Sequence, residues 1–207
     1  MVAVVQPQSM TVEQFIAQYG DDHRYELIDG EVFNLEPTGP HEEVAAFIDR
    51  KLNVQIDQLG LDYFVLQRGT LKPLGNFTAF RPDISVVDSQ ALSAEPLWAS
   101  ESILTLGCSI KFVAEVVSSN WQNDYARKFE DYAVLGIPEY WIVDYAGLGG
   151  EAFIGRPKQP TLTQCLLNEE GRYQTTLLRG AQPIAAVTFP RLTLTANQVL
   201  TAGKRTP

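Results

Sequence analysis

The chain has 207 residues, with 16 Lys and Arg against 25 Asp and Glu and a formal net charge of -9. A chain of this length buries enough surface to need neither disulfides nor a structural metal. We expect a single domain over residues 1–207, with a core over about 24–145 and a C-terminal extension over about 150–207. The acidic balance argues against a protein that coats nucleic acid through bulk electrostatic attraction.

Composition also limits the expected cellular location and the kinds of metal site that the chain could form. No run approaches the roughly 18 apolar residues of a membrane-spanning helix, and the first residues lack the basic and apolar regions of a secretory signal. Cys108 and Cys165 form no CxxC pair, so we expect reduced, semi-buried thiols in a cytoplasmic protein. His23 and His41 are too few for a multi-histidine zinc or copper site.

Charge is unevenly distributed along the chain. Residues 1–60 hold 11 acidic and 3 basic residues, a net charge of -8, whereas residues 151–207 hold 3 acidic and 7 basic residues, a net charge of +4. This asymmetry indicates either a partner-binding surface or ordinary solvated faces, because a segment of sequence is not a surface.

Start and stop signals predict two helices and a hairpin in the N-terminal third. A capping box and a closing glycine bound a helix within residues 11–20. Two strand-like runs, 24–28 and 31–35, flank the turn-forming pair at 29–30. Apolar residues then recur every three or four positions over 40–60, which predicts an amphipathic helix.

The middle of the chain is predicted to be rich in strands. Apolar and aromatic runs predict strands at 62–66, 77–80, 84–87 and 112–117. The segment 89–107 shows no clear pattern.

A second long helix is predicted over 120–135, capped by Asn120 and closed by a glycine. The aromatic and β-branched run 139–144 predicts a buried strand. Its residues Tyr140 and Trp141 are therefore expected in the core rather than as platforms that stack on nucleic-acid bases.

The last part of the chain has weaker signals. Gly147, Gly149 and Gly150 precede no predicted helix and indicate a loop. A hairpin is predicted around Gly171, and a short last helix begins at Thr195. Because helices flank a group of strands, the predicted class is α/β with a central sheet.

Acidic side chains in two strands are the first candidates for chemistry, since no Walker, GxGxxG or GxSxG motif is present. Asp83 directly precedes an apolar strand, so its carboxylate is expected at a strand end. Glu115 interrupts another apolar strand. A carboxylate there is costly unless it binds a cation, forms a core salt bridge or lies at an exposed edge.

Lys128 completes the candidate cluster. It shares a helix face with Asp124, Asp131 and Tyr132, so it is either a solvated partner of Asp124 or a cation beside Glu115. Two carboxylates and a lysine are what a magnesium-dependent phosphodiesterase needs. Hard oxygens suit magnesium, which activates water and polarises phosphoryl oxygens, and an ammonium stabilises developing negative charge.

Six segments stand in a characteristic order along the chain. They are YELIDGE at 25–31, PH at 40–41, RPD at 81–83, EVVS at 115–118, D-x3-K-x3-Y at 124–132 and GIPEYWIVD at 136–144. Together they resemble the Uma-type endonuclease family, a domain of unknown function within the PD-(D/E)xK restriction-endonuclease-like superfamily. The resemblance covers roughly residues 10–190. It implies a restriction-endonuclease-like core, in which helices flank a central mixed β-sheet, with an extra N-terminal hairpin and C-terminal strands.

The resemblance also implies roles for individual residues. Asp83, Glu115 and Lys128 match the catalytic positions, and Asp83, Glu115 and the backbone carbonyl of Val116 would bind magnesium or manganese. The chain departs from the superfamily pattern at Val117, where the consensus has lysine. In the Uma-type family that lysine lies in the following helix, at the position of Lys128.

His41, Glu31 and Asp124 are secondary candidates. His41 either faces the metal or serves only at the start of a helix, and Glu31 is either part of the site or an ordinary hairpin residue. The predicted function is hydrolysis of phosphodiester bonds in DNA, with RNA as the second choice, by a homodimer. The alternatives are a catalytically silent nuclease-like module that binds nucleic acid or protein, and a hydrolase of small phosphorylated molecules.

Overall fold

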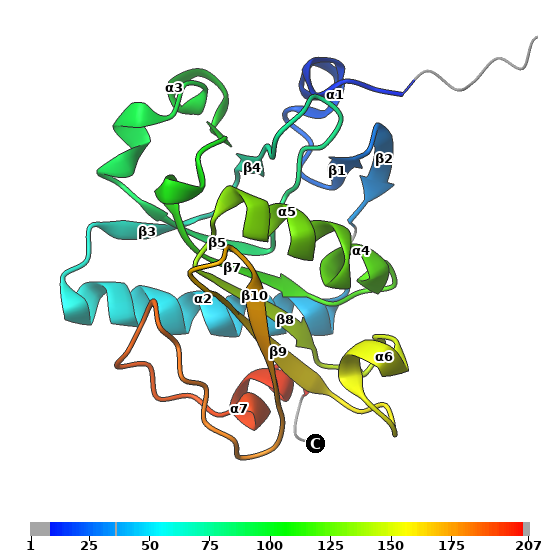
Figure 1. The fold of residues 1–207 in the computed structure, drawn as a ribbon, viewed down its shortest axis with the longest axis vertical. Coiled ribbons are helices and arrows are strands. Elements are labelled where there is room, and N and C mark those ends of the chain that lie inside the picture. Colours follow the sequence, from blue (N-terminus) through cyan, green and yellow to red (C-terminus); the bar gives the residue numbers. More distant parts are fainter. Residues whose placement is uncertain (1–8, 36, 205–207) are drawn as a thin grey trace, which may run out of the picture.

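The computed structural model describes residues 9–35 and 37–204 and centres on one six-stranded mixed sheet (Figure 1). The strand order is β10-β9-β8-β7-β5-β3. Its strands are β3 (Tyr63–Leu66), β5 (Ile84–Asp88), β7 (Ile110–Val116), β8 (Glu139–Asp144), β9 (Thr161–Leu167) and β10 (Tyr173–Leu178). Only β7 and β8 pair in parallel, and the other neighbours are antiparallel.

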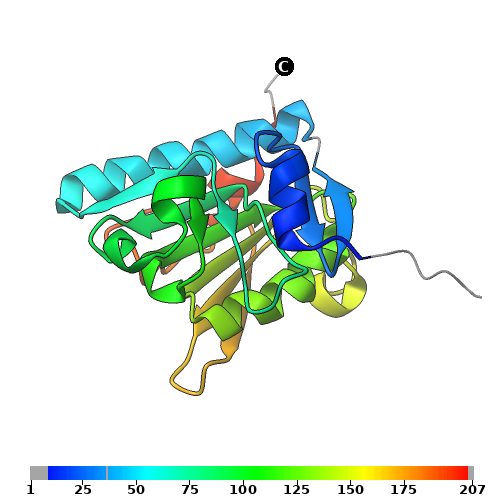
Figure 2. The same ribbon diagram turned by 90° about the horizontal axis from the view of Figure 1, so that it is seen from above.

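Helices cover both faces of this sheet (Figure 2). On one face lie α2 (Gly39–Leu59) and α7 (Ala196–Leu200), and on the other lie α4 (Trp121–Tyr125) and α5 (Arg127–Leu135). The predicted α/β class, with a central mixed sheet flanked by helices, is thereby confirmed. Within the described residues, no helix is long and apolar enough to cross a membrane.

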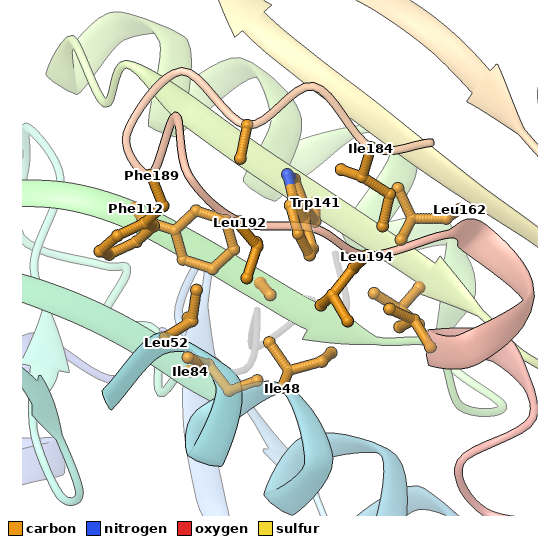
Figure 3. Close-up of a cluster of buried hydrophobic side chains, with 14 of the residues drawn as sticks. Ile48, Leu52, Ile84, Phe112, Trp141, Leu162, Ile184, Phe189, Leu192 and Leu194 are labelled. Atoms are coloured by element: carbon orange, nitrogen blue, oxygen red, sulfur yellow. The ribbon is translucent and has the colours of Figure 1, made fainter. Parts of the chain in front are cut away.

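The larger core lies between α2 and the sheet (Figure 3). Its buried side chains come from α2, α7, all six strands of the sheet and the segment before α7, and they include Ile48, Leu52, Ile84, Phe112, Trp141, Leu162, Ile184, Phe189, Leu192 and Leu194. Alternate residues of the same strands pack on the opposite face against α5, as the two-residue period of a strand requires. Tyr140 and Trp141 are fully buried on opposite faces, so their prediction as core residues is confirmed.

The N-terminal part forms a smaller layer beside the sheet. It consists of α1 (Val12–Tyr19) and the hairpin of β1 (Tyr25–Ile28) and β2 (Glu31–Asn34), all as predicted. Asp29 and Gly30 have φ angles of 50° and 84°, the left-handed conformation that a two-residue hairpin turn needs.

Short elements occupy the segments in which the sequence shows a weak hydrophobic pattern or none. They are the strands β4 (Thr70–Leu71) and β6 (Ile103–Leu104), the helices α3 (Trp98–Glu101) and α6 (Glu151–Ile154), and the 3-10 turns η1 (Ala91–Ala94) and η2 (Gly107–Ser109). The loop at the glycines of 147–150 is confirmed, but these glycines do precede a helix, because Gly150 is the N-cap of α6. A four-residue helix is too short to show the periodicity of an amphipathic helix.

Two other predictions about elements are wrong. Residues 77–80 form no strand and only bridge singly to Leu27 and Leu71, because the neighbouring β1 and β4 are short. The helix over 120–135 is divided at Ala126, whose φ and ψ are -123° and -77°. Asn120 lies at the start of α4, but its side chain accepts no capping hydrogen bond, since its backbone is not in the extended conformation of an N-cap.

The cysteines also differ from expectation. Cys108 is exposed and Cys165 is buried, so neither is semi-buried, and both are free thiols. Cys165 lies on β9 within the core, whereas Cys108 lies in η2 at the surface. The expectation about a secretory signal concerns residues 1–8, which lie outside the described residues.

Candidate active site

The pairing of β5 with β7 brings the two predicted catalytic carboxylates together. The register of β5 and β7 ends at Ile84 with Ala114, so Asp83, one residue before β5, lies near Glu115, and both carboxylates line the same pocket. Glu115 points to the face covered by α5, where Lys128 and Tyr132 contact it, whereas Asp83 lies at the strand end and contacts His41 of α2. The amide of Val116 donates a hydrogen bond of 2.7 Å to Asp83 Oδ2 and orients this carboxylate.

Lys128 enters from α5 and is almost fully buried, with 4% of its side chain exposed. Its Nζ lies 3.1 Å from Glu115 Oε2, 3.4 Å from Asp124 Oδ1 and 3.4 Å from Glu26 Oε2. The i,i+4 pair with Asp124 is therefore present, but it lies inside a buried cluster rather than in solvent. An ammonium has three N–H donors, so each carboxylate can accept one of them.

Tyr132 orients the other side of Glu115. Its hydroxyl donates a 2.7 Å hydrogen bond to Glu115 Oε1 from one helical turn beyond Lys128. Both oxygens of Glu115 thus have partners, and β7 is an interior strand. Of the alternatives considered for Glu115, the exposed edge position is excluded and a buried salt bridge is present.

His41 lies beside Asp83 at the start of α2. Its Nε2 is 3.3 Å from Asp83 Oδ2, and its side chain is buried. Thr38, not His41, is the N-cap of this helix. His41 therefore lies in the candidate site, and its Nδ1 has no hydrogen-bond partner within the described part of the chain.

The hairpin contributes a residue other than the one predicted. Glu31 is exposed on β2 and does not line the site. Glu26, three residues before the turn on β1, is 2% exposed and forms an ion pair with Lys128. The signal that singles out Glu115, an acid inside an apolar strand, also applies to Glu26 and would have identified it.

The cluster lines a small pocket of about 30 Å³. Asp83 also lines a wider groove of about 410 Å³ that runs between α2, β3 and the start of β5. The Asp83 side chain is 25% exposed, so it is the acid of the cluster that a ligand can reach from the surface. The pocket is lined by Glu26, Leu35, His41, Arg81, Asp83, Glu115, Val116, Ser118, Asn120, Asn123, Asp124 and Lys128.

The profile of the Uma2 family, described as "Putative restriction endonuclease", matches residues 12–197. This range includes every residue of the candidate site. The chain belongs to the Uma2 family.

A solved structure supports the fold of this Uma2 member. It is described as a "putative nuclease belonging to DUF820" from Anabaena variabilis ATCC 29413, and it superposes with a TM-score of 0.70. The two share 14% sequence identity, and the similarity covers 94% of this chain and 99% of the other. At this identity the likeness establishes the restriction-endonuclease-like fold alone. No curated protein matches the chain.

The Uma2 site carries more negative than positive charge. Burial raises the pKa of Glu26, Glu115 and Asp124, and Lys128 lowers these pKa values only in part. Burial alone would lower the pKa of Lys128, but the surrounding carboxylates raise it well above its ordinary value. Lys128 therefore stays protonated, while the raised pKa values of the three acids show that one ammonium does not fully compensate for burying them together.

The pKa of His41 is also shifted by burial and by a neighbouring carboxylate. Burial lowers its pKa, but the hydrogen bond and charge of Asp83 outweigh this effect and raise the pKa above its ordinary value. The pair of His41 and Asp83 thus favours an imidazolium opposite a carboxylate.

Hard oxygen atoms make the cluster chemically suitable for a divalent cation. Among the described residues, no group of three or more His, Cys, Asp or Glu side chains is placed to hold a metal ion. The fit therefore rests on Asp83 and Glu115 with the carbonyl of Val116. Magnesium keeps several of its waters, so two carboxylates suffice as side-chain ligands, and a cation would offset the excess negative charge of the pocket.

Asp124 should make the metal-free protein less stable as the pH rises. Its pKa is raised by burial from 3.8 to about 7, so the folded state binds the proton more tightly than the unfolded state. The free energy of unfolding should then fall between pH 4 and 7, by at most about 4 kcal/mol from this group. Asp124→Asn should remove this loss and be more stable than the native chain at pH 8.

Urea unfolding in the presence of EDTA, repeated from pH 4 to 8, measures this difference. Asp57→Asn on the exposed side of α2 is the matched control and should follow the native chain. Parallel pH profiles for the native chain and Asp124→Asn would contradict the raised pKa.

Proposed function

We propose that this Uma2 member is a divalent-metal-dependent endonuclease that hydrolyses phosphodiester bonds in DNA, with RNA as the second substrate. The observation that carries the proposal is the meeting of Asp83, Glu115 and Lys128 in one pocket beside an open groove. Asp83 directly precedes β5, Glu115 lies in β7 and Lys128 in α5, and the sequence separates Asp83 from Lys128 by 45 positions. Family membership and the nuclease-like fold support the same chemistry.

Each residue of the site has a role in this proposal. A magnesium or manganese ion, when bound, supplies Lewis acidity to a phosphoryl oxygen and to water. Asp83, Glu115 and the Val116 carbonyl would hold it. The Val116 amide and His41 keep the Asp83 carboxylate oriented, and Tyr132 does the same for Glu115.

Lys128 acts through its charge. Because its pKa lies well above the ordinary value, its ammonium donates hydrogen bonds and does not accept a proton from water. If a cation took the place of Lys128 as the partner of Glu115, one donor of the ammonium would become available. That donor orients the attacking water and stabilises the negative charge that develops on the phosphoryl group.

Cleavage assays test the proposal directly. Native protein with manganese should nick supercoiled plasmid or cut single-stranded DNA, and EDTA should abolish the cleavage. The double variant Asp83→Ala, Lys128→Ala should lose it to below detection. Asp88→Ala, at the other end of β5 and paired with Lys111, is the matched control and should remain active.

Other outcomes assign the chain to one of the alternatives. Binding of DNA that EDTA does not weaken, without cleavage of DNA or RNA, would contradict the proposal and support a nuclease-like binding module. Hydrolysis of small phosphate esters without cleavage of nucleic acid would identify the protein as a hydrolase of small phosphorylated molecules. The homodimer and the cytoplasmic location stay predictions from the sequence.

A further inference from the structure

Glu26 is a buried carboxylate that reaches the site from outside the six-stranded sheet. It lies on β1, which pairs with β2 and bridges singly to Ala79. Its Oε2 lies 3.4 Å from Lys128 Nζ and accepts a 3.3 Å hydrogen bond from the Arg81 amide. The N-terminal layer therefore contributes a charged group to a site built otherwise from the central sheet and its helices.

The hairpin does not need this charge in order to dock. An apolar cluster that includes Phe15 and Leu27 already attaches α1 and β1 to the segment around residue 79. On the outside, Arg127 and Asp29 form an ion pair of 3.0 Å. A buried carboxylate costs free energy unless it is paired, so attachment of the hairpin does not explain why an acid occupies this position.

The geometry around Lys128 does explain it. Its ammonium meets carboxylates from three elements: Glu26 on β1, Glu115 on β7 and Asp124 on α4. Three carboxylates lie within ion-pair distance of an ammonium that has three donors, so each can pair with one of them. Without Glu26, one buried donor would lack an acceptor, which is costly, and the nitrogen would be held only by the other two acids.

We propose that Glu26 is a positioning residue that holds the Lys128 ammonium where the reaction needs it. The inference rests on the proposed nuclease function, in which Lys128 contacts the reacting groups. Glu26 itself touches Lys128 and not the substrate. Its loss should therefore lower the rate of the chemical step while substrate binding changes little.

Glu26→Gln keeps the size of the side chain and removes its charge, and Glu26→Asp keeps the charge but shortens the reach. Both should lower kcat for DNA cleavage by about 10- to 100-fold, the usual effect of losing a partner that orients a catalytic group, with KM within about twofold. Glu31→Gln makes the same chemical change on the same hairpin at an exposed position and should leave kcat unchanged.

Thermal melting in EDTA at pH 8 separates positioning from a structural role. Glutamine keeps an acceptor oxygen for the Lys128 ammonium and the Arg81 amide and avoids the cost of burying a charge. Glu26→Gln should therefore melt no lower than the native chain although its kcat falls. A fall in kcat that merely follows a lower melting temperature would overturn the proposal.

Nitrogen-15 NMR of the lysine ammonium groups gives a readout that does not need cleavage. The native chain should show a protected Lys128 signal, identified by its loss in Lys128→Arg. That signal should shift or broaden in Glu26→Gln and Glu26→Asp, and stay in place in Glu31→Gln. An unchanged Lys128 signal in both Glu26 variants would overturn the positioning role even if cleavage is confirmed. If the native chain cleaves nothing, the proposed function fails, while the NMR signal still decides whether Glu26 holds Lys128.

Discussion

Replacement of Lys128 by methionine is expected to destabilise the metal-free protein by about 3–5 kcal/mol, the usual cost of removing one partner from a buried ion pair. Methionine fills much of the same space, so the loss comes from charge. Glu115, Glu26 and Asp124 would then face one another without the ammonium that lies within 3.4 Å of each. DNA cleavage should be lost in the same variant.

Manganese should recover part of this stability, because a bound cation stabilises the folded state by mass action. The increase in melting temperature with millimolar manganese should be larger in Lys128→Met than in the native chain. Lys158→Met is the control: this lysine is exposed and donates one hydrogen bond to the Leu148 carbonyl. Equal stability of the native chain and Lys128→Met in EDTA would show that the ammonium does not balance the carboxylates.

Most residues of the candidate cluster could be singled out from the sequence because they follow local rules. Asp83 directly precedes a strand, Glu115 lies within an apolar strand, and Lys128 and Tyr132 share a helix face. Each of these positions can be derived from a two-residue or 3.6-residue period. The resemblance to the Uma-type family indicated which of these residues belong to one site. The antiparallel pairing of β5 and β7 brings Asp83 near Glu115.

Other features depend on contacts between distant segments. Glu26 meets Lys128 across 102 positions of sequence, and although its place inside an apolar strand marks it as a candidate, no local pattern shows that Lys128 is its partner. The break of the helix at Ala126 is similar, since alanine is the best helix former. It lies between the buried Asp124 and Lys128, so contacts with the site outweigh intrinsic propensity there.

Replacement of Asp83 by asparagine should abolish the response to metal while the fold is kept. The amide oxygen of asparagine can still accept the hydrogen bond from Val116, so the strand end should stay in place. The charge that the cation needs is lost, and the His41 imidazolium loses its partner. Cleavage should fall by at least about 10²–10³-fold, comparable to removing one preorganised electrostatic contact from an active site.

Melting curves with increasing manganese separate this effect from general damage. In the native chain, manganese at about 100 times its dissociation constant should add about 2.7 kcal/mol to the free energy of unfolding. Asp83→Asn should lose most of this increase, whereas Asp88→Asn, at the far end of β5 beside Lys111, should keep it. If manganese raised the melting temperature of Asp83→Asn as much as that of the native chain, the cation would not bind at Asp83. No response in the native chain would remove the metal from the proposal, because Asp83 and Glu115 line the same pocket and are its proposed ligands.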